Sequence, residues 1–376
     1  MKEIKEILDR VSTFGSNERA ILATVVDVQG SGYRLPGARM LILENGDTFG
    51  MVSGGCLEAD VLERARKILS SGRAEVFTYD TTNDENSVFS LNMGCRGVVR
   101  ILLEPVGREN SLLRSFQDSG KDREDRTIAT LISAESDVAV GSRAVYTRSA
   151  GFVNNDLPHS LQTLRSLEDQ CRQFHESDRD YSFHTFEASE GSLEFAFESI
   201  KPPISLLIFG AGADAIPLAR LASELGWQAS VFDHRPAYLT NERFATAERL
   251  VAFDRETPIG SMGGDSRTVA VIMTHNYEHD RRILRQLLRS SVAYIAALGP
   301  KRRTEQLLDE IASDGENFTG EQLARLYAPA GLDIGADSPE AIALSIVAEI
   351  QSVLRNRGGG RLRDRQGSIY DRKRES

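Results

Sequence analysis

The stretch from Ile204 to Asp233 limits the possible folds of this chain more than any other. Ile204–Phe209 is a continuous apolar run, as strands buried on both faces tend to be. It leads directly into Gly210-Ala211-Gly212-Ala213-Asp214-Ala215, the G-x-G-x-x-A spacing of dinucleotide-binding turns. A second strand then ends at Asp233, where an acid about 20 residues after the loop would reach a ribose hydroxyl. This order predicts a Rossmann-type nucleotide-binding unit.

Alternation of strand-like and helix-like segments continues to residue 357, which predicts a parallel sheet and an α/β fold. We expect strands at 204–209, 228–233, 249–253, 268–274 and 293–298. We expect helices at about 213–225, 278–290, 300–313 and 339–355. Residues 358–376 are rich in arginine and lack apolar periodicity, so a flexible basic tail is expected there.

The glycine loop suggests an anion site. A helix that follows such a loop offers free N–H groups and the positive end of its dipole to a phosphate. We therefore expect Gly210, Gly212 and Asp233 to hold a phosphate or ribose. His234 and Arg235 could instead favour a 2′-phosphate, so the choice between NAD and NADP stays open. Taken alone, the loop indicates an NAD(P)-dependent oxidoreductase.

Residues 1–200 are expected to form an N-terminal α+β domain, with residues 106–200 poorly defined. An amphipathic helix opens it, a buried strand follows at 20–26, and Asn45-Gly46 marks a hairpin. Residues 107–202 alternate helix-like and strand-like pieces. We expect them to complete the antiparallel sheet of this domain, before the linker Lys201-Pro202-Pro203. No internal repeat is evident.

Composition excludes several classes. The formal charge of -10 argues against a general nucleic-acid binder. The sequence has no run of about 18 apolar residues, so no membrane span is expected. The charged N-terminus has no apolar signal core. Together these two features predict a cytoplasmic protein. Three cysteines without a C-x-x-C pair indicate neither a disulfide framework nor a zinc finger.

Two of these cysteines lie in glycine-rich loops. In Ser53-Gly54-Gly55-Cys56-Leu57-Glu58 a thiol stands at the start of a helix, which favours the thiolate, a nucleophile and soft metal ligand. In Met93-Gly94-Cys95-Arg96-Gly97 a second thiol stands beside a cation. Gly54 and Gly55 would let a bulky ligand approach the backbone. A buried or incidental cysteine remains the commoner explanation for both, and we expect Cys171 to be simply buried.

At these loops the chain resembles the XdhC/CoxI family of molybdenum-enzyme accessory proteins. The resemblance covers the first 106 residues and most of 204–357. It is carried by 30–40, 53–58, 94–105, 210–212, 231–235, 273–280, 298–303 and 329–335. The family pattern after the second cysteine usually reads Gly-Gly, and here Arg96 replaces the first of these glycines.

The resemblance implies a helper that binds molybdenum cofactor (molybdopterin), holds it during sulfuration, and delivers it to a xanthine dehydrogenase or carbon monoxide dehydrogenase-like apoenzyme. Such a chaperone is not a turnover enzyme. A cysteine desulfurase and a second copy of the chain are the other implied partners. We expect Cys56 and Cys95 to face the molybdenum, Glu58 to carry a proton, and the site to lie between the two domains.

A zinc hydrolase is a third hypothesis, because His275-Asn276-Tyr277-Glu278-His279 fits H-x-x-E-H. That motif requires one continuous helix, whereas Val269–Met273 is read as a strand. We therefore expect His275 and His279 to line a pocket at the sheet edge. A pure scaffold for the target enzyme also remains possible.

Overall fold

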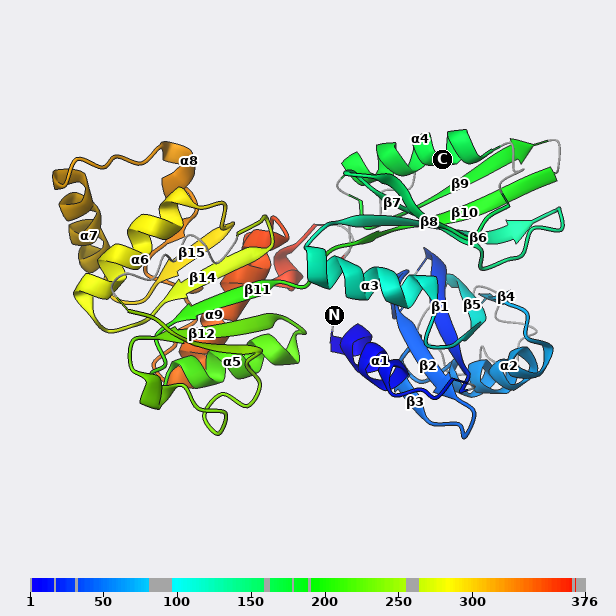
Figure 1. The fold of residues 1–376 in the computed structure, drawn as a ribbon, viewed down its shortest axis with the longest axis horizontal. Coiled ribbons are helices and arrows are strands. Elements are labelled where there is room, and N and C mark those ends of the chain that lie inside the picture. The colour runs from blue at the N-terminus through cyan, green and yellow to red at the C-terminus, as the bar shows by residue number, and fades with distance from the viewer. Residues whose placement is uncertain are drawn as a thin grey trace. The chain divides into compact units, whose positions relative to one another are not determined.

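The computed structural model describes residues 2–16, 18–30, 33–80, 97–158, 163–177, 179–188, 191–254, 264–366 and 369. The chain forms two compact units, Glu3–Pro202 and Pro203–Ser376 (Figure 1). We call them the antiparallel unit and the Rossmann unit. The structure confirms the expected α/β class, with antiparallel sheets and helices in the first unit and a parallel sheet in the second.

In its described residues, the antiparallel unit contains two five-stranded sheets with the orders β3-β2-β1-β5-β4 and β8-β7-β6-β10-β9. The first sheet comprises β1 (Ala20–Gly30), β2 (Arg39–Leu43), β3 (Thr48–Gly50), β4 (Glu75–Asp80) and β5 (Gly97–Val106). The second comprises β6 (Arg126–Ala134), β7 (Arg143–Thr147), β8 (Gly151–Asn155), β9 (Tyr181–Ala188) and β10 (Gly191–Ile200). The helices are α1 (Lys2–Ser12), α2 (Glu58–Ser71), α3 (Ser111–Asp122) and α4 (Leu164–Glu176).

These two sheets repeat one topology. In each half, a helix precedes three strands, a second helix and two more strands, and the strand orders match. The pairing register of both central strands shifts at the same place, after Val25 in β1 and after Leu131 in β6. The buried faces of α2 and α4 also match in spacing: Val61, Ala65, Ile68 and Leu167, Cys171, Phe174. Residues 107–202 therefore build a second sheet of their own, not an extension of the first, and the chain contains a repeat that its sequence does not reveal.

The two halves interlock through exchanged charges. Arg39 of β2 donates to Glu198 of β10, with Nη1 2.9 Å from Oε1, and Arg143 of β7 donates to Glu104 of β5 at 2.8 Å. Arg39 and Arg143 are each 2% exposed. Burial lowers the pKa of Arg39, but the charge and hydrogen bonds of Glu198 outweigh it and raise this pKa above its usual value.

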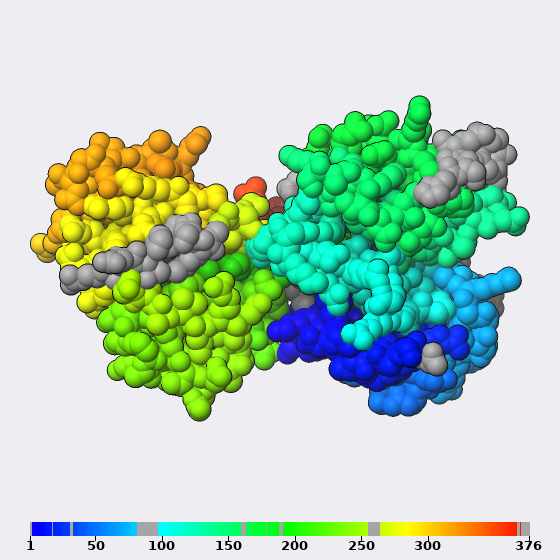
Figure 2. Space-filling model, viewed as in Figure 1, coloured from blue at the N-terminus to red at the C-terminus, as the bar shows by residue number. Residues whose placement is uncertain are grey.

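An apolar cluster adds to this contact, because α1, α3 and both sheets contribute to it. Ile7 and Val11 of α1 and Leu112 and Leu113 of α3 lie in the same buried cluster as strand residues from both sheets. Figure 2 shows the two halves of this unit, blue and cyan to green, packed directly on one another. Burial of this shared cluster makes the two halves one unit.

The part of the Rossmann unit that the structure describes has six parallel strands in the order β13-β12-β11-β14-β15-β16. The strands are β11 (Ser205–Phe209), β12 (Gln228–Asp233), β13 (Arg249–Ala252), β14 (Thr268–Ile272), β15 (Tyr294–Ala297) and β16 (Leu326–Tyr327). The helices are α5 (Ala215–Glu224), α6 (Tyr277–Arg289), α7 (Lys301–Ser313), α8 (Gly320–Leu323) and α9 (Pro339–Leu354). The predicted elements agree within a few residues, whereas β16 and α8 were not expected.

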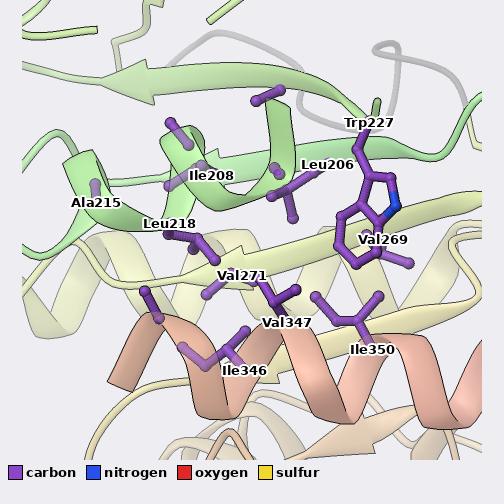
Figure 3. Packing of buried hydrophobic residues seen from close by; sticks show 14 of the residues in the cluster. Leu206, Ile208, Ala215, Leu218, Trp227, Val269, Val271, Ile346, Val347 and Ile350 are labelled. Carbon is purple, nitrogen blue, oxygen red and sulfur yellow. The ribbon is translucent and has the colours of Figure 1, made fainter. Parts of the chain in front are cut away.

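Helices cover both faces of this sheet. α5 and α9 pack on one face, where Leu206 and Ile208 of β11 meet Leu218, Ile346 and Ile350 (Figure 3). α6 and α7 pack on the other face around Phe209 and Phe232. Strand order reverses between β11 and β14, the position at which open α/β sheets bind ligands beyond the carboxyl ends of their strands. Of the helices in the described ranges, none is long and apolar enough to cross a membrane.

Candidate functional site

The Cys56 loop is organised around one hydroxyl group, that of Ser53. Ser53 Oγ accepts from the backbone N–H groups of Gly55 (3.2 Å) and Leu57 (3.1 Å) and from Cys56 Sγ (3.5 Å). It donates its own proton to Glu58 Oε2. Cys56 is exposed, two residues before α2 begins, whereas Ser53 is 4% exposed. The sequence pointed to Cys56 and Glu58, but not to the serine that connects them.

Glu58 is anchored at the first residue of α2. Its Oε1 also accepts from the backbone N–H of Ser53 at 2.8 Å. Burial alone would raise the pKa of Glu58, but the hydrogen bonds from Ser53 lower it below its usual value. Glu58 is therefore ionised at neutral pH, and it is the terminal acceptor of the hydrogen-bond chain that runs from Cys56 through Ser53.

A polar trio joins the first turn of α2 to the end of β4. Asp60 Oδ2 accepts from Tyr79 Oη at 2.7 Å and from Arg64 Nε. The Arg64 guanidinium also lies 4.6 Å from the Phe77 ring centroid. Tyr79 is the penultimate residue of β4, and it is 6% exposed. The predicted site residue Cys95 lies outside the described residues, in the segment between β4 and β5. The trio thus holds the end of β4 close to the helix that follows Cys56.

The second half of the unit shows that the fold itself does not need this trio. Tyr79 and Phe186 occupy equivalent positions in the two halves. Each pairs with the second residue after the glycine that begins the neighbouring strand. At the positions of Asp60 and Arg64, the second half has Ser166 and Gln170, immediately before the equivalent buried residues of α4. Phe186 is nearly as buried as Tyr79, at 9%. The same architecture therefore forms without the hydroxyl, the carboxylate or the cation.

In the Rossmann unit, the glycine loop is packed closely against β14. Gly210 has a φ of +120°, and a Cβ there would clash with the carbonyl group of Met273. Only glycine fits both requirements. The Ala211 N–H donates to Asp233 Oδ2 at 2.6 Å, and the Ala211 carbonyl accepts from Arg243 at 2.9 Å. Both backbone polar groups of Ala211 are thus used within the chain.

Asp233 is fully buried, and both of its oxygens are engaged. Oδ1 accepts from the Arg235 backbone N–H (2.8 Å) and Nε (2.9 Å), while Oδ2 accepts from Arg235 Nη2 (2.9 Å) as well as from Ala211. Burial raises the pKa of Asp233, but these hydrogen bonds lower it to about 2. The Arg235 guanidinium in turn lies 4.1 Å from the Tyr238 ring centroid. A ribose hydroxyl could reach Asp233 only by displacing Arg235.

A second carboxylate lies at the start of α5. Asp214 Oδ2 accepts from His275 Nε2 at 3.0 Å, and a Cβ at Gly212 would lie 2.5 Å from Asp214 Oδ1. His275 has a φ of 57°, a left-handed conformation that is strained for a residue other than glycine. The carboxylate lies where a dinucleotide would place its phosphates, so it opposes an anion there. Asp214 could have been noticed in the sequence as an acid inside the loop motif.

The two histidines of the H-x-x-E-H match point to different partners. α6 begins at Tyr277, so His275 precedes the helix, as the strand before it predicted. His279 lies on the first turn, with its ring 4.5 Å from that of His234, while His275 binds Asp214. Across the described part of the chain, no group of three or more His, Cys, Asp or Glu residues could hold a metal ion. The geometry gives no support to a zinc hydrolase.

Comparison with known proteins assigns the family. Residues 14–80 match the model of the XdhC and CoxI family, and residues 206–350 match that of the XdhC Rossmann domain. A Bacillus subtilis (strain 168) protein whose name describes a probable xanthine dehydrogenase component is 32% identical, over 89% of this chain and 92% of its own length. This chain belongs to the XdhC and CoxI family.

Two further relatives extend the comparison. The molybdenum cofactor insertion chaperone PaoD of Escherichia coli (strain K12) is 25% identical over 91% of this chain and 86% of that protein. The crystal structure of a xanthine dehydrogenase from Bacillus halodurans is 29% identical and superposes with a TM-score of 0.74. It covers 95% of this chain and 97% of that chain. The likeness therefore extends over both units, including residues 107–202, for which the sequence had indicated no family.

Proposed function

We propose that this protein binds molybdenum cofactor, supports its sulfuration, and delivers it to a xanthine dehydrogenase or carbon monoxide dehydrogenase-like apoenzyme. Family membership and the likeness to the chaperone PaoD support this function. The observation that carries it is the exposed Cys56 thiol with a hydrogen-bonded route through Ser53 to the Glu58 carboxylate. The protein would act by binding and handing over a cofactor, not by turning over a substrate.

The proton route gives Cys56 a way to become a thiolate. Coordination to a metal strongly acidifies a thiol; the thiol proton would then pass to Ser53 Oγ while the Ser53 hydroxyl proton passes to Glu58, so that negative charge moves from the carboxylate to the sulfur. The backbone N–H groups of Gly55 and Leu57 would hold the serine oxygen in place during this transfer. A thiolate is the form of cysteine that binds soft metal centres. Cys56 would then be a ligand for the molybdenum of the cargo.

We further propose that Cys95 supplies a second thiol at this site. Gly97, two residues along the chain, pairs with Gly30 at the end of β1. Tyr79, near the other end of the segment, is hydrogen-bonded to Asp60 of α2. Both flanks of the segment that contains Cys95 are thus attached to elements next to the Cys56 loop, which supports one binding site for the two thiols.

Uptake of released cofactor tests this function. We expect the purified protein to bind molybdenum cofactor stoichiometrically, and Cys56→Ala and Cys95→Ala each to weaken the binding. Cys171→Ala is the matched control, because Cys171 is fully buried on α4 and should leave uptake unchanged. Unchanged uptake by both thiol variants would reject the thiols as ligands, and absence of uptake by the wild type would reject the function.

Two partners of this function are proposed with it. A cysteine desulfurase would supply the sulfur, and a second copy of the chain would complete a homodimer. Native mass spectrometry of the protein alone, and mixed with a desulfurase and an apo-molybdoenzyme, measures each association. A monomer that still takes up and delivers cofactor would reject the dimer without affecting the rest of the proposal.

A further inference from the structure

The ring of Tyr33 lies on the backbone of the Cys56 loop. A Cβ built on Gly54 would be 3.3 Å from Tyr33 Cγ and 3.4 Å from both Cδ1 and Cδ2. Near-equal distances to these three atoms place Gly54 over the face of the ring and not at its edge. Any side chain at position 54 would press on the ring. Glycine is therefore needed here to seat one face of an aromatic side chain, two residues from Cys56.

The opposite side of this ring is available to a ligand. Tyr33 is 64% exposed. Two other large apolar side chains are also exposed: Leu35, two residues further along the chain, at 37%, and Met51, whose segment is bound to α1, at 45%. Glu3 of α1 fixes both neighbouring segments, because its oxygens accept from Arg34 Nη2 (2.5 Å) and from the Met51 backbone N–H (2.9 Å). The chain next to Tyr33 at Arg34, and the chain before the Cys56 loop at Met51, are thus both anchored to α1.

The second half again shows what the fold requires. The turn at Leu35 and Ala38 has its equivalent at Ala139 and Ser142, with the same backbone hydrogen bond. Two residues before Ala139, where the first half has Tyr33, the chain has an exposed Asp137. An aromatic residue at this position is therefore not needed to form the turn between the first two strands of a sheet. It occurs only in the half that carries the Cys56 loop.

We propose that Tyr33 is a stacking platform for the planar pterin ring of the cofactor, and this inference rests on the proposed function. A ring with backbone against one face and solvent at the other is suited to stack on a flat heteroaromatic ring. Gly54 and Gly55 add no side chain that would obstruct such a ring, and Cys56 stands next to them. Tyr33 would bind the organic part of the cargo, while Cys56 binds its metal.

Two probes separate stacking from metal ligation: released molybdenum cofactor, and molybdopterin without molybdenum. We expect Tyr33→Leu to weaken binding of both probes on the order of tenfold, the usual effect of removing a stacking ring. Tyr33→Phe, which keeps the ring, should stay within twofold of wild type. Cys56→Ala should weaken binding of the molybdenum-containing probe only. Hydrogen exchange would establish that each variant is folded.

The other results would overturn the platform. Binding of both probes by Tyr33→Leu within twofold of wild type would reject it and leave the proposed function standing. The platform would equally be rejected if Tyr33→Leu bound both probes normally but failed to transfer cofactor to an apoenzyme, since Tyr33 would then contact the protein partner. If the wild type bound neither probe, the proposed function would fail, and the platform with it.

Discussion

The guanidinium of Arg39 pairs with the carboxylate of Glu198, its partner 159 residues away in sequence. Arg143 and Glu104 repeat this pair from the other half of the unit, so each sheet supplies a buried cation to the other and an anion in return. These matched charges, which are costly to separate, help to hold the two sheets together.

Glu198→Gln should therefore destabilise the antiparallel unit by about 3–5 kcal/mol, because it leaves Arg39 charged and unpaired in the interior. Glu104→Gln should have a similar effect through Arg143. Hydrogen exchange measured across a urea series can follow residues 3–202 separately from the Rossmann unit. A loss below about 1 kcal/mol for both variants would contradict the interlock.

Tyr79→Phe should weaken cofactor uptake while costing only about 1–2 kcal/mol of stability, since one hydrogen bond to Asp60 is lost and the ring remains. The second half tolerates phenylalanine at the equivalent position. Tyr294→Phe is the matched control, because it removes a buried tyrosine–carboxylate bond, to Glu349, in the Rossmann unit. Equal uptake by the two variants would show that the Tyr79 hydroxyl has only a structural role.

Asp233 should make the Rossmann unit sensitive to acid. Its pKa is lowered to about 2 in the folded state, so its contribution of about 2 kcal/mol is present above pH 4 and is lost as the pH falls from 4 towards 2. Asp233→Asn should lower stability at neutral pH and flatten this acid dependence. The fluorescence of Trp227, the only tryptophan of the chain, reports unfolding of this unit directly. Identical acid profiles of variant and wild type would disprove the linkage.

Calorimetry with NAD(H) and NADP(H) should detect no binding up to millimolar concentration. Asp233 is already bound by Arg235, and the Asp214 carboxylate lies at the N-terminus of α5. Asp214→Asn should increase the affinity for a dinucleotide, because it removes a negative charge from the phosphate position. Micromolar binding by the wild type would contradict this account and favour an NAD(P)-dependent oxidoreductase.

The local elements of this protein could be predicted because their causes are local. The apolar run before Gly210, the Asn45-Gly46 hairpin and the helix that starts next to Cys56 depend on residues close in sequence, and all are observed. The parallel sheet followed from the alternation of strands and helices, whose right-handed connection leaves few topologies. The loop motifs also indicated the family, because their residue types and order are specific.

Only the tertiary structure revealed the repeat and the partners of the site residues. Sequence periodicity does not show that β6–β10 copy β1–β5, because the two halves share burial and register but only a few scattered residue identities, such as Arg39 and Arg143. Nor could sequence show that Ser53 links Cys56 to Glu58, or that Arg235 already occupies Asp233. A motif states which groups are present. Their availability depends on hydrogen bonds and burial that form only when distant segments pack together.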